Sequence, residues 1–324
     1  MRAVFFGDRN KENSEDIKNR LPSSLEVYFI AQPLGKETAY LAAQAEIISM
    51  FSESRADKAV LDKLPKLKLI AASTTGYDNI DLEYAHSKNI TVTNVPAYGS
   101  QTVAEFAFGL ILAVARKIVW GDKFFEQTLR PNMSQLEGFD LAGKTLGIIG
   151  TGRIGANVIK YAKAFDMKIL AYDAHENENL ARKLDFNYTG LDELLCQADV
   201  ITLHVNLSPT TRHLINKQNI SQIKRGSILI NTSRGEVIES QALIEALESG
   251  ILSGVGLDVL EEEKMLAGDK NDEIIEIDKK LIQMPNVVVT AHMAYNSREA
   301  RSRILETNTD NIKKFLEGNI QNAV

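Results

Sequence analysis

Short apolar runs alternate with longer amphipathic segments in two stretches of the chain. Within residues 1–95 the apolar runs are RAVFFG, LEVYFI, AEIISMF, LKLIAAS and ITVTNV, and from residue 145 onward they are LGIIG, KILAYD, DVITLHV, SILINTS, SGVGLDV and NVVVTAH. Runs of this length are typical of buried strands, and the segments between them predict helices. The alternation therefore predicts an α/β protein with two doubly wound parallel sheets, each covered by helices on both faces.

The sequence also predicts that the chain returns to its first domain. At 324 residues the chain is longer than a single hydrophobic core usually accommodates. The segment after His292 is too short for a third domain, and from Ser297 it has the pattern of one long helix. We therefore expect two domains, made of residues 1–100 completed by 296–324, and of residues 101–295.

The segment between the two alternating stretches is apolar on more than one face. Its sequence, QTVAEFAFGLILAVARK at residues 101–117, predicts a helix that must be buried nearly all round. Contacts between domains or between subunits would bury it, and we favour the subunit contact. The sequence therefore predicts a homodimer.

The composition is that of an ordinary globular protein, and it argues against several classes of partner. Hydrophobic residues make up 44% and charged residues 25%, and the net charge is −6, so no nucleic acid or anionic membrane is expected as a partner. The most apolar segment, FAFGLILAVA at 106–115, is too short to span a bilayer, and the N-terminus does not have the pattern of a signal peptide. The single cysteine, Cys196, suits the reducing cytoplasm. We expect a cytoplasmic protein that acts on small molecules, and we expect no metal site.

A cofactor-binding pattern lies in residues 144–173, KTLGIIGTGRIGANVIKYAKAFDMKILAYD. An apolar strand, a Gly-x-Gly-x-x-Gly loop, a helix and a second strand follow one another, as in a βαβ unit. Gly150 permits the tight turn, Gly152 lets the backbone approach a pyrophosphate, and Gly155 lets the helix pack close to the strand. Asp173 is expected to accept hydrogen bonds from the adenosine ribose, and its charge repels a 2′-phosphate. The pattern predicts a Rossmann domain that prefers NAD to NADP.

Ionisable side chains follow the strands in the second half of the chain. In doubly wound sheets the ligand lies beyond the carboxyl ends of the strands. Arg234 follows SILINTS, glutamates 261–263 follow SGVGLDV, and His292 ends NVVVTAH, so we expect them to converge at the nicotinamide. A solvated acidic loop would also explain the three glutamates, and their chemistry alone does not decide which of them takes part. His204 ends DVITLHV, the strand expected beside LGIIG, and is therefore assigned to the cofactor.

An arginine, a carboxylate and a histidine suit hydride transfer between a 2-keto acid and a 2-hydroxy acid. Arg234 can hold the substrate carboxylate through two parallel hydrogen bonds, which fixes the plane of the substrate. His292 can protonate the carbonyl oxygen as the hydride arrives, because imidazole titrates near neutral pH. A buried glutamate beside a histidine would favour its protonated form and hold its tautomer.

Six motifs occur in one order over nearly the full length of the chain. They are STTGYDNID at 73–81, NVPAYG at 94–99, GTGRIG at 150–155, INTSRGEVI at 230–238, GLDVLEEE at 256–263 and TAHMAY at 290–295. Together they resemble the D-isomer-specific 2-hydroxyacid dehydrogenase family, and most closely its D-lactate dehydrogenase branch. The resemblance implies a flavodoxin-like substrate domain, a Rossmann NAD-binding domain and an active site in the cleft between them.

The resemblance also assigns residues that chemistry alone leaves open. It implies that Arg234 binds the substrate carboxylate and carbonyl, that Glu263 pairs with the histidine, and that His292 is the acid–base group. The backbone at Thr75 and Gly76 is expected to meet the substrate carboxylate. Besides the glycine motif and His204, the expected cofactor contacts are Arg153, Ile154, Asp173, Val205, Asn206, Thr211, Thr232, Ser233 and Asp258.

Two positions depart from the family pattern. Asn206 stands where a proline is usual after the His-Val pair, which could alter a turn on the cofactor side. Gly99–Ser100 replaces the common Ser-Pro, which could loosen the hinge between the domains. Neither position belongs to the predicted catalytic set of Arg234, Glu263 and His292.

The substrate is expected to be small and to carry one carboxylate. No cluster of arginines or lysines appears in STTGYDNID or NVPAYG, where a phosphorylated or dicarboxylic substrate would need a second cation. Tyr98 and Tyr295 instead suit a small apolar group beside the carboxylate. We therefore expect reduction of pyruvate to D-lactate, with the D configuration implied by the resemblance. The alternatives are a glyoxylate or hydroxypyruvate reductase and a non-enzymatic NAD-sensing protein similar to some corepressors.

Overall fold

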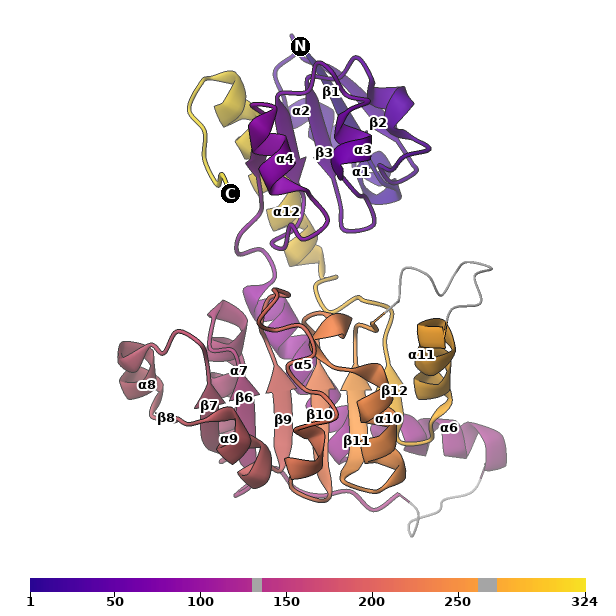
Figure 1. Ribbon diagram of the computed structural model, residues 1–324, viewed down its shortest axis with the longest axis vertical. Coiled ribbons are helices and arrows are strands. Elements are labelled where there is room, and N and C mark those ends of the chain that lie inside the picture. The colour runs from indigo at the N-terminus through magenta and orange to yellow at the C-terminus, as the bar shows by residue number, and fades with distance from the viewer. Residues whose placement is uncertain (130–135, 262–272) are drawn as a thin grey trace. The chain divides into compact units, whose positions relative to one another are not determined.

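The chain forms two compact units (Figure 1). The computed structural model describes residues 1–129, 136–261 and 273–324. The first unit consists of Met1–Tyr98 and Ser297–Val324, and the second of Gly99–Asn296. The chain therefore passes from the first unit into the second and back again.

The first unit is built on a parallel sheet. Its strands are β1 (Arg2–Phe6), β2 (Glu26–Ile30), β3 (Ile47–Met50), β4 (Leu69–Ala72) and β5 (Thr91–Thr93). Their order across the sheet is β2-β1-β3-β4-β5, so the chain switches direction between β1 and β3. This order is flavodoxin-like, and it confirms the predicted doubly wound sheet.

Both faces of this sheet are buried, because successive side chains of a strand point to opposite sides. Along β1, Ala3 and Phe5 face one side while Val4 and Phe6 face the other, and all four are buried. The helices that supply the two layers are α2 (Ser14–Arg20) and α12 (Arg298–Leu316) on one face, and η1 (Ala39–Ala42), α3 (Lys58–Leu61) and α4 (Leu82–Ser87) on the other. The short helix α1 (Asp8–Glu12) directly follows β1.

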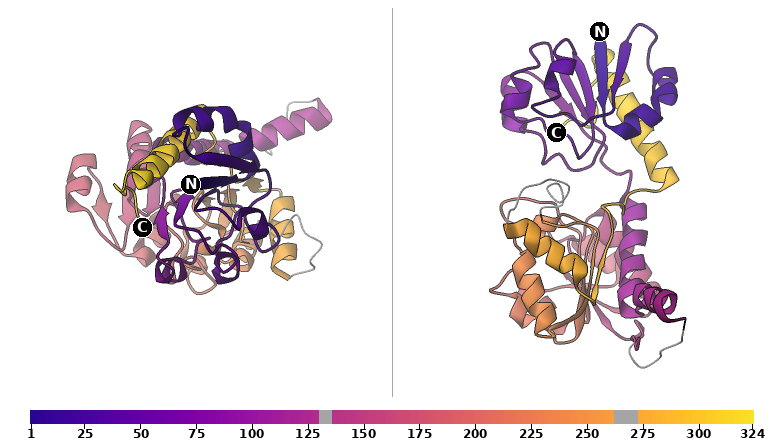
Figure 2. Two further views of the ribbon diagram at one scale, coloured as in Figure 1. Left: turned by 90° about the horizontal axis from the view of Figure 1, so that it is seen from above. Right: turned by 90° about the vertical axis from the view of Figure 1, so that its right-hand side faces the viewer.

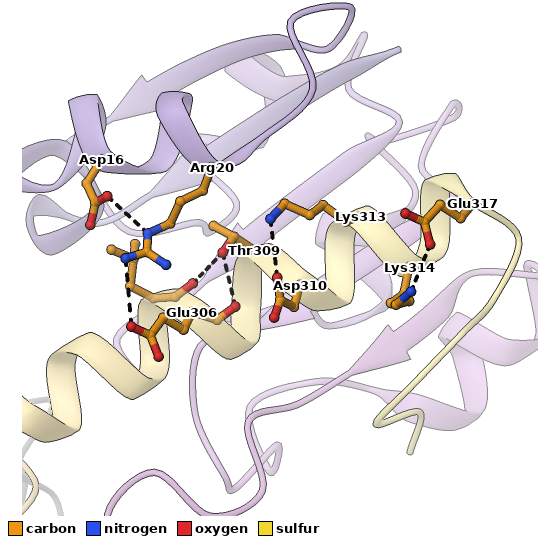
Figure 3. Close-up of polar contacts among 9 residues, drawn as sticks. Asp16, Arg20, Glu306, Thr309, Asp310, Lys313, Lys314 and Glu317 are labelled. Atoms are coloured by element: carbon orange, nitrogen blue, oxygen red, sulfur yellow. Dashed lines mark hydrogen bonds and ion pairs between the residues drawn. The ribbon is translucent and has the colours of Figure 1, made fainter.

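The helix α12 joins the C-terminal segment to the first unit. Ser297 caps its first turn by accepting a hydrogen bond from a backbone amide. On its inner side Ile304 and Ile312 are buried. On its outer side Arg20 of α2 lies 3.7 Å from Glu306, as Figure 3 shows. The helix is therefore attached mainly through its apolar side, since an exposed ion pair contributes little.

The described residues of the second unit form a second parallel sheet. Its strands are β6 (Thr145–Ile149), β7 (Lys168–Tyr172), β8 (Asn187–Tyr188), β9 (Val200–Leu203), β10 (Ser227–Asn231), β11 (Leu252–Leu257) and β12 (Val287–Val289). Their order is β12-β11-β10-β9-β6-β7-β8, which places the switch point between β6 and β9. The apolar runs predict all of these strands except β8, which is too short to produce such a run.

Helices cover both faces of the second sheet (Figure 1 and Figure 2). One face carries α5 (Ser100–Ala115) and α7 (Arg153–Ala164), and the other carries α9 (Leu191–Gln197), α10 (Ser240–Glu248) and α11 (Glu273–Gln283). A Cβ atom at Gly254 of β11 would lie 2.8 Å from a methyl carbon of Val114, so glycine lets α5 approach the sheet closely. The helices α6 (Ile118–Thr128) and α8 (Glu178–Leu184) lie beside this core. None of the helices in the described ranges is both long enough and apolar enough to cross a bilayer.

Candidate active site

The glycine motif places Gly150 and Gly152 in the loop between β6 and α7 and Gly155 in the first turn of α7, and the fold itself requires two of these three glycines. Gly150 has φ +95°, and a Cβ there would lie 2.6 Å from the His204 carbonyl oxygen. A Cβ at Gly155 would lie 2.1 Å from the Gly150 carbonyl oxygen, so only glycine fits where α7 packs on the loop. Gly152 has φ −62°, and a Cβ there would meet no atom within 4 Å. The open space at Gly152 leaves room for a pyrophosphate, and that contact stays a prediction.

The first turn of α7 offers hydrogen-bond donors beside this loop. Its N-cap is Gly152, so no capping side chain accepts from the first backbone amides. Such a helix N-terminus attracts anions through its free donors and its dipole. Arg153 is exposed at the first position, and Ile154 packs partly on the core. The loop and the helix together fit the pyrophosphate of a dinucleotide.

Asp173, just after β7, is hydrogen-bonded to the glycine loop. Its Oδ2 accepts from the Thr151 amide at 2.7 Å and from the Thr151 hydroxyl at 2.9 Å, and its Oδ1 accepts from the His175 amide at 2.9 Å. Burial raises the pKa of the Asp173 carboxyl, but these hydrogen bonds outweigh burial, so its pKa lies below the ordinary value. A carboxylate has about four acceptor positions, so Oδ1 keeps room for a ribose hydroxyl.

Two buried polar atoms after neighbouring strands have no hydrogen-bond partner among the described residues. They are Nδ1 of His204, after β9, and Oγ1 of Thr232, after β10. Burying such atoms is costly unless a ligand or water satisfies them. Although part of His204 is exposed, burial lowers its pKa to about 3, so the ring is neutral at physiological pH. The two atoms fit a neutral polar group such as the nicotinamide end of NAD.

The loop after β9 is closed by one hydroxyl group. Oγ1 of Thr211 donates to the Asn206 carbonyl at 2.6 Å and accepts from the Ser208 amide at 2.8 Å. This closure holds the turn in which asparagine replaces the proline of the family pattern. Val205 packs against the glycine loop, with its Cγ1 3.0 Å from the Cβ position of Gly150. The contacts of this loop with NAD stay predictions.

The backbone that carries Arg234 is fixed by a buried asparagine. Asn231, the last residue of β10, accepts from the Ser233 amide at 2.9 Å and hydroxyl at 2.7 Å, and donates to the Arg234 carbonyl at 2.8 Å. Gly235 packs on the segment after β11, since a Cβ there would lie 2.0 Å from the Leu260 carbonyl oxygen. The half-buried Arg234 side chain therefore leaves a loop with little freedom, as a substrate anchor requires.

The loop that carries His292 is held by the carboxylate of Asp258. Oδ1 of Asp258 accepts from the Thr290 hydroxyl at 2.5 Å and from the Met293 amide at 2.9 Å. Its Oδ2 accepts from the Ala294 amide at 2.8 Å, and its carbonyl accepts from the His292 amide at 2.9 Å. Asp258 is 1% exposed, so its side chain holds the histidine loop from inside the protein. A direct contact of Asp258 with NAD stays a prediction.

Three adjacent strands bring these loops to one edge of the sheet. β10 pairs with β11, and β11 pairs with β12, all in parallel. Arg234, the segment after β11 and His292 therefore follow strand ends that point the same way, whereas their convergence at the nicotinamide stays a prediction. An arginine that binds a carboxylate and a histidine that moves a proton are the groups that reduction of a 2-keto acid requires.

Of the three glutamates after β11, the structure describes Glu261 alone. Glu261 is buried, and its Oε1 lies 2.6 Å from Nε2 of His213, while its Oε2 accepts from a backbone amide of α10. Glu261 therefore does not belong to a solvated acidic loop. Glu262 and Glu263 lie outside the described residues, so the pairing of Glu263 with His292 stays a prediction. No local sequence pattern predicts the His213 contact, because the partners are 48 positions apart.

The residues predicted to contact the substrate belong to both units. Thr75 and Gly76 lie in the first unit, in the loop after β4, where Thr75 is exposed and Gly76 is half-buried. Tyr98 also belongs to the first unit, and its carbonyl accepts from Nε of Arg303 at 2.7 Å. Tyr295 belongs to the second unit and follows the loop that Asp258 holds. The contacts of these residues with one substrate stay predictions.

Known proteins are similar to this chain over most of its length. Residues 108–294 match the family model for the NAD binding domain of D-isomer specific 2-hydroxyacid dehydrogenases. The crystal structure of D-lactate dehydrogenase from Aquifex aeolicus, complexed with NAD and lactic acid, has a TM-score of 0.90 and 36% identity, covering 98% of this chain and 96% of that one. The glyoxylate reductase of Korarchaeum cryptofilum is 40% identical over 82% of this chain and 77% of its own. A 2-hydroxyacid dehydrogenase homolog from Zymomonas mobilis is 38% identical over 94% of this chain and 93% of its own.

Proposed function

Because the chain belongs to the D-isomer-specific 2-hydroxyacid dehydrogenases, we propose that it reduces pyruvate to D-lactate with NADH. It is an oxidoreductase whose cofactor, NAD, carries the hydride when bound. The observation that supports the reaction best is the shared edge of β10, β11 and β12, where Arg234 lies in the loop after β10 and His292 in the loop after β12, with β11 between them. We place the enzyme in the cytoplasm, in keeping with its single cysteine.

Each proposed catalytic side chain has one task. Arg234 holds the substrate carboxylate and carbonyl with its planar guanidinium, which fixes the face of the carbonyl that meets the nicotinamide. His292 donates a proton to the carbonyl oxygen during reduction and takes it back during oxidation. Glu263 is assigned to orient His292, as the resemblance implies, and Glu261 is already occupied by its contact with His213.

The cofactor-binding residues divide according to the parts of NAD. The glycine loop and the first turn of α7, with Arg153 and Ile154, are assigned to the pyrophosphate. Asp173 is assigned to the adenosine ribose, and its lowered pKa keeps it charged and unfavourable to a 2′-phosphate. His204 and Thr232, with their unpaired buried atoms, are assigned to the nicotinamide end.

A small monocarboxylic substrate suits the proposed pocket residues. The backbone at Thr75 and Gly76 is assigned to the carboxylate, and Tyr98 and Tyr295 to the methyl group of pyruvate. The similarity to the glyoxylate reductase of Korarchaeum cryptofilum favours a second candidate, reduction of glyoxylate or hydroxypyruvate. The two candidates use the same chemistry and differ in the group beside the carbonyl.

Initial rates of NADH oxidation with pyruvate, glyoxylate, hydroxypyruvate and larger 2-keto acids test the proposal. We expect the highest kcat/KM with pyruvate and only D-lactate in chiral analysis of the product. A preference of about tenfold or more for glyoxylate or hydroxypyruvate, the scale on which a pocket discriminates one small group, would favour the second candidate. An L product would contradict the assigned stereochemistry.

A homodimer is also part of the proposal. Along α5, Gly109 is exposed and Phe106 and Leu112 are only half-buried, although the helix is strongly apolar. The following helix, α6, has no buried residue, and its Phe125 is 55% exposed. An apolar surface of this kind on two consecutive helices suits a second copy of the chain.

A further inference from the structure

The loop after β4 is joined to the residues after β5 by three hydrogen bonds. The Val95 amide donates to the Thr74 carbonyl at 3.0 Å, and the Thr75 hydroxyl donates to the Val95 carbonyl at 2.8 Å. The third is donated by Nδ2 of Asn94 to the Thr75 carbonyl, also at 2.8 Å. This last bond fixes the orientation of the peptide group between Thr75 and Gly76, because it holds the carbonyl oxygen of that group.

The orientation of that peptide group leaves one donor for a ligand. A trans peptide points its carbonyl oxygen and its N–H in opposite directions, and no cis peptide occurs in the described chain. Because Asn94 holds the Thr75 carbonyl, the Gly76 N–H points away from Asn94. This N–H makes no hydrogen bond within the described residues, and Gly76 is only half-buried. The N–H is therefore positioned to bind an anionic oxygen.

Asn94 is itself held by the C-terminal segment. Nδ2 of Asn311, in α12, donates to the Asn94 carbonyl at 2.8 Å, and Oδ1 of Asn311 accepts from Nδ2 of Asn322 at 2.8 Å. The Asn94 amide donates to the Asn322 carbonyl at 3.1 Å. Asn94 is 7% exposed and Asn311 is 0% exposed. Because backbone carbonyls only accept, the amide nitrogens must face them, and the network has a single orientation.

We propose that Asn94 is a positioning residue for the carboxylate of the 2-keto acid. This inference rests on the proposed function, in which the backbone at Thr75 and Gly76 meets that carboxylate. Asn94 fixes the direction of the Gly76 N–H before the substrate binds, so the bond to the charged oxygen requires little reorganisation. Asn311 and Asn322 hold Asn94 in turn. This role accounts for the fully buried side-chain amide of Asn311 in α12.

The substitution Asn94→Asp tests this role, because it keeps the side-chain shape but places a carboxylate oxygen against the Thr75 carbonyl. We expect KM for pyruvate to rise about tenfold to a hundredfold, the scale of one hydrogen bond to a charged group. The inhibition constant of oxamate, a competitive inhibitor with the same carboxylate, should rise in parallel. The kcat and the Kd of NADH should stay within about threefold of wild type, since Asn94 contacts neither the transferred proton nor the cofactor.

The matched control is Asn308→Asp, on the same helix. Asn308 is 3% exposed, donates to the Ala71 carbonyl at 3.1 Å and accepts from the Ser49 hydroxyl at 3.1 Å. This substitution should lower the unfolding temperature and leave KM for pyruvate unchanged. A rise in KM as large as that of Asn94→Asp would indicate general loosening of the first unit and would overturn the proposal.

The outcomes separate this inference from the proposed function. A wild-type protein that reduces no 2-keto acid would contradict the proposed function, whereas an active wild type and a folded Asn94→Asp with unchanged KM would overturn the role of Asn94. If Asn94→Asp does not fold, Asn322→Gly replaces it, because glycine keeps the left-handed backbone at φ +52°. Without the hydrogen bond from the Asn322 side chain to Asn311, KM for pyruvate should rise about threefold. An unchanged KM for pyruvate would then overturn the proposal.

Discussion

A single buried carboxylate, that of Asp258, supports the loop in which the proposed acid–base histidine lies. Asp258→Asn would turn one acceptor into a donor that faces a backbone amide or the Thr290 hydroxyl. We expect kcat to fall about tenfold to a hundredfold, because the position of His292 would be less well defined. Stopped-flow measurement of hydride transfer together with NADH titration tests this. A large loss of NADH affinity with unchanged hydride transfer would instead indicate that Asp258 serves the cofactor.

The substitution Arg234→Lys keeps the positive charge but loses the planar pair of donors. We expect kcat/KM for pyruvate to fall about a hundredfold or more, because lysine cannot hold a carboxylate in a fixed plane. The fold should survive, since Asn231 fixes this loop through the backbone of Arg234 and not through its side chain. Unchanged kinetics in a folded variant would remove Arg234 from the site.

The buried ring of His204 makes the free energy of unfolding depend on pH. Its pKa is about 3 in the folded protein, compared with 6.5 for an ordinary histidine. As pH falls below 6.5, His204 binds a proton in the unfolded chain but stays neutral in the folded chain until about pH 3. The free energy of unfolding therefore decreases over this range. His204→Gln, which is neutral throughout, should lose less stability than wild type between about pH 7 and pH 4.5 in urea unfolding. Equal losses would show that His204 accepts a proton in the folded state.

Among the elements, the glycine motif at the start of α7 contains two glycines that the fold requires, Gly150 and Gly155, and one glycine, Gly152, that is assigned to the ligand. Gly152→Ala should leave the unfolding temperature unchanged or slightly higher, because its φ of −62° suits alanine and its Cβ meets open space. NADH binding should weaken about tenfold, because the methyl group occupies the space of the pyrophosphate. Gly155→Ala is the contrasting variant: its Cβ would lie 2.1 Å from the Gly150 oxygen, so it should lower the unfolding temperature itself. Equal NADH affinity in Gly152→Ala and wild type would contradict the assignment.

Strands and polar contacts differ in how far the sequence predicts them. The central strands of both sheets are continuous apolar runs because both of their faces are buried, and this burial is visible in the sequence as local composition. The shared edge of Arg234 and His292 follows from strand direction alone. The hydrogen bonds that hold the loops at this edge cannot be predicted in the same way, because Asp258 and Asn231 make contacts that depend on tertiary packing. The same reason hides the partner of Glu261, which no local pattern connects to His213.

At the scale of the whole molecule, association through α6 is open to a direct test. Phe125→Asp places a charge on a side chain that is 55% exposed in the single chain. We expect wild type to sediment with the mass of two chains and Phe125→Asp to dissociate at micromolar concentration, because an unpaired charge in an apolar contact is costly. Tyr40→Asp is the control, since Tyr40 is 69% exposed in the first unit and should not affect association. A wild type that sediments as a monomer would exclude the homodimer.

The divided first unit also affects the order in which the protein folds during synthesis. Residues 99–296 are contiguous, so the second unit can bury its core as soon as they have left the ribosome. One face of the first sheet, including Phe5 and Ile47, is covered in part by Ile312 of α12, which is translated after the whole second unit. Until α12 is translated, the α12 contribution to that apolar face is missing, and incompletely covered apolar surface favours aggregation. The unit that begins first is therefore completed last, after the α12 residues have been translated.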